Sequence, residues 1–244
     1  MKISERHPRE TGRDYALRTI KENLISLELA PGSQISENEL AEAMGISRTP
    51  VREALIELAK VKVIEIVPQK RSLVTPLNEE LIEEARFLRS AMETAVVSLV
   101  CERRTEEDLR AFEENVKLQS FCMANGMSEK IMQLDDEFHR AFYEIAHKME
   151  IYRLMQNMAI HFDRVRNMAL YSVSEIKIVQ DHEAILKAIR EQNGEMAGSL
   201  LKKHLNRYRI DAGAIKERFP EFFQSNRCVQ TRGDEREELV NSLI

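Results

Sequence analysis

Hydrophobic residues recur at helical spacing through most of the chain. In the first segment Leu17, Ile20, Leu24 and Leu27 are separated by three or four residues. This spacing predicts an amphipathic helix from about Glu10 to Leu27. The stretch "LAPGSQIS" that follows contains proline and glycine and ends the periodic pattern.

Two shorter helices follow this break. Ser36 and Glu39 have the spacing of a capping box, and Gly45 suits the end of a helix, so residues between them are expected to form a short helix. In the next helix Val51 and Leu55 lie on the face that points inward.

The start of the third helix is open to two interpretations. Either Ser47 caps it, or Thr49 caps it with Pro50 at the favoured first position.

The pattern then changes to short β-branched runs. "VIEIV" and "SLVT" flank the polar residues "PQKR", which is typical of a small hairpin. Three helices followed by a hairpin predict a winged helix-turn-helix domain over residues 1–77.

Residues 78–219 are helical almost throughout. Thr105 and Asp108 form another cap signal, and Asn-Gly pairs at 125–126 and 193–194 are natural breaks. The expected helices cover 78–104, 105–123, 128–147, 150–170, 175–193 and 195–217. The fold class is therefore mainly α, with an N-terminal winged helix-turn-helix, a C-terminal antiparallel all-helical bundle and a polar tail over 220–244.

Charge and composition refine this picture. The formal net charge is −5, but residues 1–78 hold 12 Lys and Arg against 11 Asp and Glu. Phosphate binding in the N-terminal domain must therefore come from local clustering of cations. The chain has no apolar run long enough for a membrane span and no secretory signal, and its three cysteines form no disulfide framework. We expect a cytoplasmic protein.

The N-terminus of the third helix carries candidate DNA contacts. Arg48 and Arg52 are four residues apart and share a face other than the inward one. Arginine can bind guanine with two hydrogen bonds, and Ser47 and Thr49 can donate to phosphates. Lys70 and Arg71 at the hairpin tip could reach a neighbouring groove. The alternative is that the helix arginines are solvated and pair with Glu53 or Glu57.

The segment "LAEAMGISRTPVREALIELAKVKVIEIVPQKRSLVTPL" resembles the DNA-binding domain of the GntR family of bacterial transcriptional regulators, over about residues 10–77. The resemblance implies that Ser47, Arg48, Thr49 and Arg52 contact DNA. The chain departs from the family at two positions: Asn38 stands where members often have arginine, and Arg71 replaces a glycine at the hairpin tip.

Four residues of the helical region could bind a metal ion. Asp135 and His139 are four apart and project from one helix face, and His182 and His204 lie in later helices. A carboxylate and three imidazoles suit a divalent ion. The alternative is a surface Asp–His hydrogen bond with two half-buried packing histidines. The remaining histidines, at positions 7, 147 and 161, are assigned to ordinary surface or packing roles.

The pieces "FLRSAMETAVV", "LDDEFHRAFYEIA", "HEAILKAI" and "LKKHL" resemble the FCD ligand-binding domain of the FadR-like subgroup of GntR regulators, over about residues 79–215. This resemblance implies that Asp135, His139, His182 and His204 bind a divalent metal (Zn, Ni or Mn). It also implies a small carboxylate effector.

A second anchor for that effector could be Arg89, Arg164 or Arg166, by bidentate pairing. For each of the three, an ordinary surface ion pair is the alternative.

The sequence predicts a homodimeric transcriptional regulator that binds a near-palindromic double-stranded DNA operator, responds to the effector and is not an enzyme. Two other functions are considered. A metal-dependent hydrolase or isomerase would leave the N-terminal domain unexplained and lacks a diagnostic general base. A helical interaction module would bind no small ligand and no metal.

Overall fold

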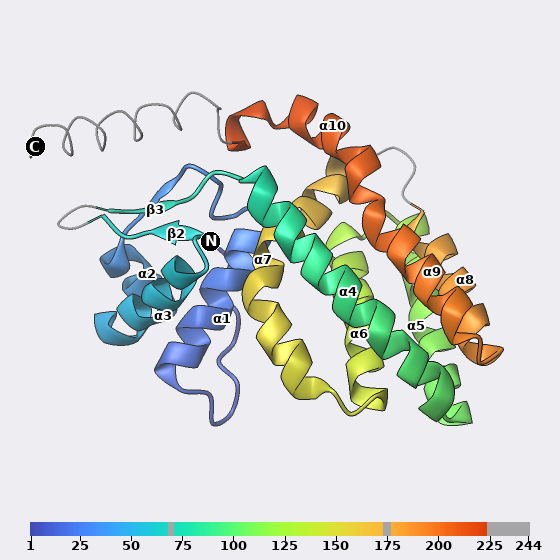
Figure 1. Cartoon of the computed structure of the whole chain (residues 1–244). Helices are drawn as coiled ribbons and strands as arrows, with labels where there is room; N and C mark the ends of the chain where they lie inside the picture. The colour runs from blue at the N-terminus through green and yellow to red at the C-terminus, as the bar shows by residue number, and fades with distance from the viewer. Residues whose placement is uncertain (68–70, 173–176, 224–244) are drawn as a thin grey trace, which may run out of the picture.

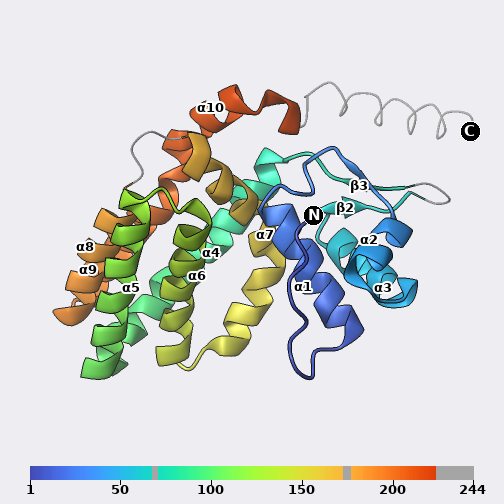
Figure 2. The ribbon, with the colours of Figure 1, turned by 180° about the vertical axis from the view of Figure 1, so that it is seen from behind.

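The computed structural model describes residues 1–67, 71–172 and 177–223. A small N-terminal domain lies beside a larger group of helices, and helix α7 stands between them (Figure 1). The view from behind shows the same division, with α1 next to α7 (Figure 2). The mainly α fold class predicted from the sequence is confirmed.

The N-terminal domain is a winged helix-turn-helix. Its elements are α1 (Gly12–Ile25), β1 (Gln34–Ile35), α2 (Glu37–Met44), α3 (Arg48–Lys60), β2 (Ile64–Glu65) and β3 (Ser72–Val74). Ile20 and Leu24 of α1 pack with Val51 and Leu55 of α3 in a fully buried core. These are the inward positions that the periodicity predicted.

The wing contains one strand more than the predicted hairpin. The described strands form an antiparallel sheet in the order β1-β3-β2, with Gln34 opposite Leu73 and Ile64 opposite Val74. The stretch "LAPGSQIS", which the sequence predicts only as a break between helices, therefore includes β1. A strand of two residues is too short to show an alternating pattern, so only its pairing with β3 reveals it.

The turn between α2 and α3 follows the predicted glycine. Gly45 ends α2 with φ of 65°, the left-handed conformation that glycine adopts without steric cost. Ser47 precedes α3 in the N-cap position, so the helix begins where the first of the two interpretations placed it, although the Ser47 side chain makes no cap hydrogen bond. Pro50 is thus the third residue of the helix rather than the first.

The two predicted capping boxes differ in outcome. Thr105 and Asp108 form both reciprocal hydrogen bonds at the start of α5. Ser36 precedes α2, but its side chain makes no cap hydrogen bond, so that capping box was wrong. The carboxylate of Glu39 instead accepts hydrogen bonds from Arg71 of the wing, which takes it away from the backbone of the cap.

The C-terminal part is a bundle of antiparallel helices. They are α4 (Glu79–Arg103), α5 (Glu106–Ala124), α6 (Ser128–Ile145), α7 (Met149–Ser172), α8 (Ile178–Arg190), α9 (Gly194–Asn206) and α10 (Tyr208–Arg218). Val97 and Val100 of α4 and Phe138 and Phe142 of α6 are at the centre of its apolar core. No helix in the described ranges is both long and apolar enough to cross a membrane.

The last predicted helix, 195–217, is two helices in the structure. Arg207 separates α9 from α10, which packs back against α7. Helical spacing continues on both sides of Arg207, so periodicity alone could not reveal the change of direction. Of the predicted tail, only a short 3-10 turn (Pro220–Phe222) and Phe223 are described, and residues 224–244 lie outside the described part.

Helix α7 contacts the winged helix at several points. The ammonium of Lys21 in α1 donates to the backbone carbonyl of Gln156 at 2.9 Å. His161 donates from Nε2 to the carbonyl of Val61, just after α3, at 2.6 Å. In the first contact α1 supplies the donor and α7 the backbone acceptor, and in the second α7 supplies the donor, so each domain holds the main chain of the other.

We expect Gly45→Ala to lower the free energy of unfolding by about 1 kcal/mol, because alanine pays a steric penalty at positive φ. A Cβ at Gly45 would meet no atom within 4 Å, so the cost comes from the backbone alone. Urea denaturation of the full chain measures it.

Gly213→Ala is the matched control, because Gly213 lies inside α10 and also has open space around it. At this position alanine should raise the free energy of unfolding by roughly 0.5–1 kcal/mol. Equal effects of the two substitutions would contradict the assigned turn.

Candidate metal and effector site and the DNA-facing surface

The structure brings the four predicted metal ligands together. Asp135 and His139 come from α6, His182 from α8 and His204 from α9. One candidate ligand atom from each lies within 4.8 Å of the others. The first three are buried and the side chain of His204 is nearly so. The alternative of a surface Asp–His pair is therefore inconsistent with the burial of Asp135 and His139.

Each histidine ring is held by a hydrogen bond at Nδ1. The acceptors are Glu93 at 2.6 Å for His139, Gln119 at 2.8 Å for His182 and Asp181 at 3.3 Å for His204. Because each acceptor is an oxygen, Nδ1 is the donor in each ring, and Nε2 keeps its lone pair when the ring is neutral. The Nε2 atoms of His139 and His182 are fully buried and have no hydrogen-bond partner among the residues that the structure describes.

Burial keeps these two imidazoles neutral. Desolvation lowers the pKa of His139, and it lowers the pKa of His182 well below its ordinary value. Nearby carboxylates act in the opposite direction but do not overcome it. A neutral imidazole with a free Nε2 is the form that binds a metal ion.

The two oxygens of Asp135 have different partners. Oδ1 lies 3.4 Å from Nε2 of His182 and 3.8 Å from Nε2 of His139. Oδ2 accepts a hydrogen bond from Arg166 of α7. Burial alone would raise the pKa of Asp135, but the guanidinium of Arg166 holds it well below its usual range. The carboxylate is therefore ionised, with one oxygen directed at the imidazoles.

A second buried carboxylate supports the same cluster. Glu93 accepts from Nε of Arg89 at 2.7 Å while it holds His139. Burial would raise the pKa of Glu93, but Arg89 and His139 lower it to about 2. Glu93 is thus a buried anion that is hydrogen-bonded on both oxygens.

Of the predicted effector residues, two lie at this cluster and one does not. Arg166 binds Asp135 and also donates to Asp163 at 2.6 Å. Arg89 is also buried, with Asp163 and Asp135 at 3.8 and 4.0 Å. Arg164 points to the winged helix instead, where it donates to the carbonyl of Thr75 at 2.8 Å.

Arg164 has an unusual environment. Its side chain is fully buried, and within the described part of the chain Nε and Nη1 have no hydrogen-bond partner. Burial lowers its pKa to about 10. Arg164 thus differs from Arg89, whose buried charge is balanced by Glu93.

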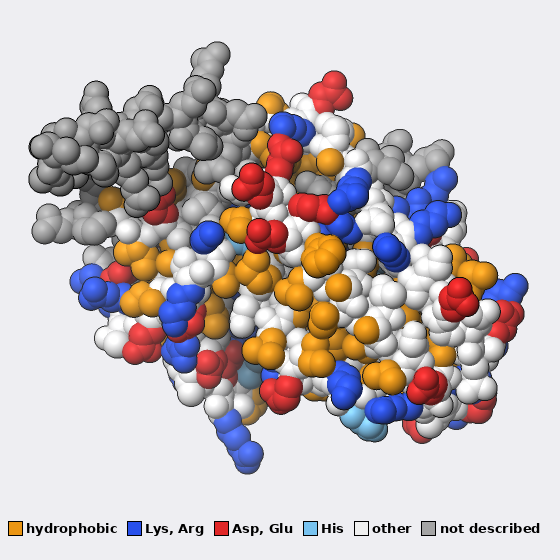
Figure 3. All heavy atoms as spheres, in the orientation of Figure 1, with side chains coloured by type: hydrophobic (Ala, Val, Ile, Leu, Met, Phe, Trp, Pro, Cys, Tyr) orange, Lys and Arg blue, Asp and Glu red, His pale blue; other side chains and the backbone are white. Residues whose placement is uncertain are grey.

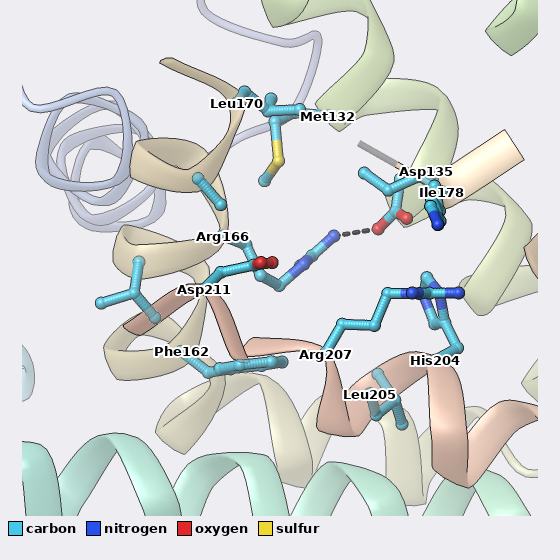
Figure 4. Close-up of a pocket in the computed structure, with 13 residues that line it drawn as sticks. Met132, Asp135, Phe162, Arg166, Leu170, Ile178, His204, Leu205, Arg207 and Asp211 are labelled. Carbon is cyan, nitrogen blue, oxygen red and sulfur yellow. Dashed lines mark hydrogen bonds and ion pairs between the residues drawn. The ribbon is translucent and has the colours of Figure 1, made fainter. Parts of the chain in front are cut away.

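A cavity of about 300 Å³ lies beside the cluster. Asp135 and His204 form part of its wall, with Arg166, Arg207 and Asp211, and Figure 4 shows Arg166 reaching across it to Asp135. The rest of the wall is largely apolar and includes Phe162 and Leu205, labelled in the same view. The cavity therefore adjoins the proposed metal ligands and two arginines.

Four residues of this site are absent from the sequence-based prediction: Glu93, Gln119, Asp181 and Arg207. Arg207 follows His204 by three residues, so it could have been found as a helical neighbour of a predicted ligand. Asp181 adjoins His182 in the sequence but contacts His204, 23 positions away. Glu93 and Gln119 are 46 and 63 positions from their histidines. No local pattern identifies them.

The predicted DNA contacts lie at the exposed start of α3. Ser47, Arg48, Thr49 and Arg52 are all exposed. Arg48 pairs with Glu37 at 3.3 Å rather than with Glu53 or Glu57. Lys70 lies outside the described residues.

Arg71, at the edge of the wing, is exposed and bound to Glu39 of α2. An exposed ion pair of this kind contributes roughly 0–1 kcal/mol to stability. A DNA phosphate could therefore replace the Glu39 carboxylate at little cost in free energy.

Two family models match the chain. The model described as bacterial regulatory proteins, gntR family, matches residues 15–74, and the FCD domain matches residues 84–207. This chain belongs to the GntR family of regulators with a C-terminal FCD domain. The resemblance identified from the sequence is therefore confirmed in both domains.

Similar proteins agree with this assignment. An uncharacterized HTH-type transcriptional regulator of Streptomyces ambofaciens is 29% identical, over 92% of this chain and 94% of its own length. The HTH-type transcriptional repressor RspR of Escherichia coli is 27% identical, over 89% and 96%. The solved structure of E. coli McbR/YncC has a TM-score of 0.74 with 19% identity, over 86% of this chain and 99% of the other, and supports the fold.

A GntR-type helix-turn-helix joined to an FCD domain makes the protein a DNA-binding transcriptional regulator rather than an enzyme. The metal-dependent hydrolase or isomerase considered from the sequence is thereby set aside.

We expect the substitution Arg→Met to change the free energy of unfolding by very different amounts at two buried positions. Arg89→Met leaves Glu93 as a buried anion without its cation and should cost about 3–5 kcal/mol in unfolding free energy. Arg164→Met removes a poorly paired guanidinium and should change stability by less than about 1 kcal/mol, or increase it. Urea denaturation of metal-free protein compares the two, and a greater loss at Arg164 would disprove this interpretation.

Proposed function

We propose that the protein binds a near-palindromic DNA operator as a homodimer, and that a small carboxylate effector held at a divalent cation changes its operator affinity. The observation that carries the metal part of this proposal is the pair of buried, unpartnered Nε2 atoms of His139 and His182, which lie beside an ionised oxygen of Asp135. Buried polar atoms without partners are rare in native proteins, and a cation would satisfy all of them at once.

The donor set fits a divalent transition metal. Asp135, His139, His182 and His204 offer one carboxylate oxygen and three imidazole nitrogens, a set that suits zinc, nickel or manganese. The oxygens that hold the three Nδ1 atoms would orient the rings, as outer partners do at known metal sites. A bound cation would supply a Lewis-acid position for an effector carboxylate.

The proposed operator contact is the N-terminus of α3. In a helix-turn-helix this end enters the major groove, where arginine can bind guanine and free N–H groups can bind phosphate. Arg48 and Arg52 are exposed there, beside Ser47 and Thr49. Lys70 and Arg71 of the wing are the proposed contacts to the adjacent backbone or minor groove. A protein with this role acts on the chromosome, which would place it in the cytoplasm.

Helix α7 is the proposed route between effector and operator. Phe162 and Arg166 lie on the cavity, whereas His161 and Arg164 of the same helix hold backbone carbonyls of the winged helix. A shift of α7 on effector binding would therefore move the support of the DNA-binding domain. Coupling of this kind typically changes affinity by about 1–3 kcal/mol.

The proposed dimer partner is a second copy of the chain, because a two-fold protein matches a two-fold operator. The support for it is an apolar surface over α4 and the adjacent part of α7 (Figure 3). Phe87 of α4 is 66% exposed and Leu154 of α7 is 71% exposed. An exposed hydrophobic surface of this kind is typical of a surface that is covered in the assembled protein.

We expect Arg52→Ala to weaken specific operator binding by about 1–3 kcal/mol, because it removes a guanidinium placed to bind a base. Lys60→Ala is the control, since Lys60 is exposed at the opposite end of the same helix. Gel-shift titration at fixed salt compares the two. Unchanged affinity in Arg52→Ala would contradict the proposed contact.

We expect His139→Ala combined with His204→Ala to abolish stoichiometric metal, because half of the donor set is lost. His147→Ala serves as the control, because His147 is exposed and lies outside the cluster. Elemental analysis of protein loaded with zinc and dialysed gives the metal content. Equal metal in the double variant and the wild type would remove the proposed site.

A further inference from the structure

We propose that the cavity beside the cluster selects a monocarboxylic acid with an apolar body over dicarboxylic acids, and that Arg207 binds its carboxylate. This inference rests on the proposed metal site and specifies the charge and shape of its effector. It is carried by three features of the described residues: the balance of buried charges, the orientation of Arg207 and the composition of the cavity wall.

The buried charges next to the cavity do not balance in the absence of a cation. Three carboxylates, Glu93, Asp135 and Asp163, face two guanidinium groups, Arg89 and Arg166, and each of these side chains is at most 13% exposed. The set therefore carries one excess negative charge and repels anions. A divalent cation would reverse this to one excess positive charge.

Three further acids lie near this set and do not change the count of buried charges. Asp211, on the cavity wall, is only half-buried, so water screens its charge. Asp136 also binds Arg166, but its side chain is 51% exposed and water screens its charge. Asp181 is balanced by its own pair with Arg207. One carboxylate on the effector would thus neutralise the metal-bound site, whereas a second would remain without a cation.

Arg207 is prepared to bind that carboxylate. Asp181 holds it through Nε and Nη2, and no hydrogen bond among the described residues engages Nη1. The side chain lines the cavity beside His204, one of the four proposed ligands (Figure 4). A guanidinium fixed on one side by a carboxylate loses little entropy when its other side binds an anion.

The rest of the cavity wall offers little to a second carboxylate. Phe162, Leu170 and Ile178 line it with apolar surface, and Asp211 adds a further acid. Lys177 also lines the cavity, but it is exposed to solvent. A carboxylate placed against these apolar side chains would lose its water without gaining a buried partner, which is costly. The volume of about 300 Å³ is at the small end for ligand pockets, so the apolar body is short.

The test compares hexanoate with hexanedioate, which share one carbon chain and differ by a single carboxylate. Calorimetric titration of the full-length, zinc-loaded protein should give a dissociation constant for hexanoate about tenfold or more below that for hexanedioate, a difference of about 1.4 kcal/mol. Removal of zinc with EDTA should weaken hexanoate binding by at least about tenfold, because the excess charge becomes negative.

Arg207→Gln should weaken hexanoate binding by about tenfold, which is the effect of losing one charged hydrogen bond. Arg209→Gln is the matched control, since Arg209 is exposed, pairs with Glu83 and does not line the cavity. Zinc content is measured for every variant, because Arg207 also holds the acid that orients His204. An Arg207→Gln variant that retains zinc isolates the effect on the acid.

Hexanedioate binding as tight as hexanoate binding, or equal hexanoate affinity in wild type and Arg207→Gln, would overturn the inference. So would zinc-loaded protein that binds no hexanoate, although the metal part of the proposed function would then stand. If the wild-type protein retains no zinc, the proposed metal site fails and this inference fails with it.

Discussion

The buried carboxylate of Asp135 is the interaction on which the rest of the site depends. One oxygen faces the imidazoles of His139 and His182, and the other accepts from Arg166. Because Arg166 belongs to α7, the side chain of Asp135 connects the histidine cluster to the helix that supports the winged helix. Burial strengthens each of these contacts, since little water competes for the charges.

The buried ion pairs around Asp135 cost desolvation free energy. Ion pairs buried in a protein contribute little net stability, because removing the charges from water offsets most of their attraction. The bundle nevertheless holds Glu93, Asp135 and Asp163 with their arginines in its interior. Replacing buried ion pairs by apolar residues of similar volume is often neutral or stabilising, so stability alone does not account for these charges.

The same reasoning applies to the boundary between the domains. Arg164 is a fully buried cation that donates to a backbone carbonyl and has two unpartnered nitrogens. His161, one turn earlier on α7, also donates to a carbonyl of the winged helix. These contacts depend on the exact placement of α7, so a small displacement of the helix would disturb them. A junction of this kind suits a regulator whose two domains must communicate.

Much of this molecule follows from the sequence alone, because helical periodicity and cap chemistry act over a few residues. The helix-turn-helix, the glycine that ends α2 and the pairing of Asp135 with His139 on one face are of this local kind. Other features form only when segments that are distant in the sequence pack together, and these were decided by the tertiary structure. They are strand β1, the turn at Arg207, and the hydrogen bonds that Glu93 and Gln119 accept from the histidines. Arg164 binds the winged helix and Arg166 binds the histidine cluster, although only two positions separate them in the sequence. Backbone geometry fixes which residues share a face, but packing of whole helices fixes what that face meets.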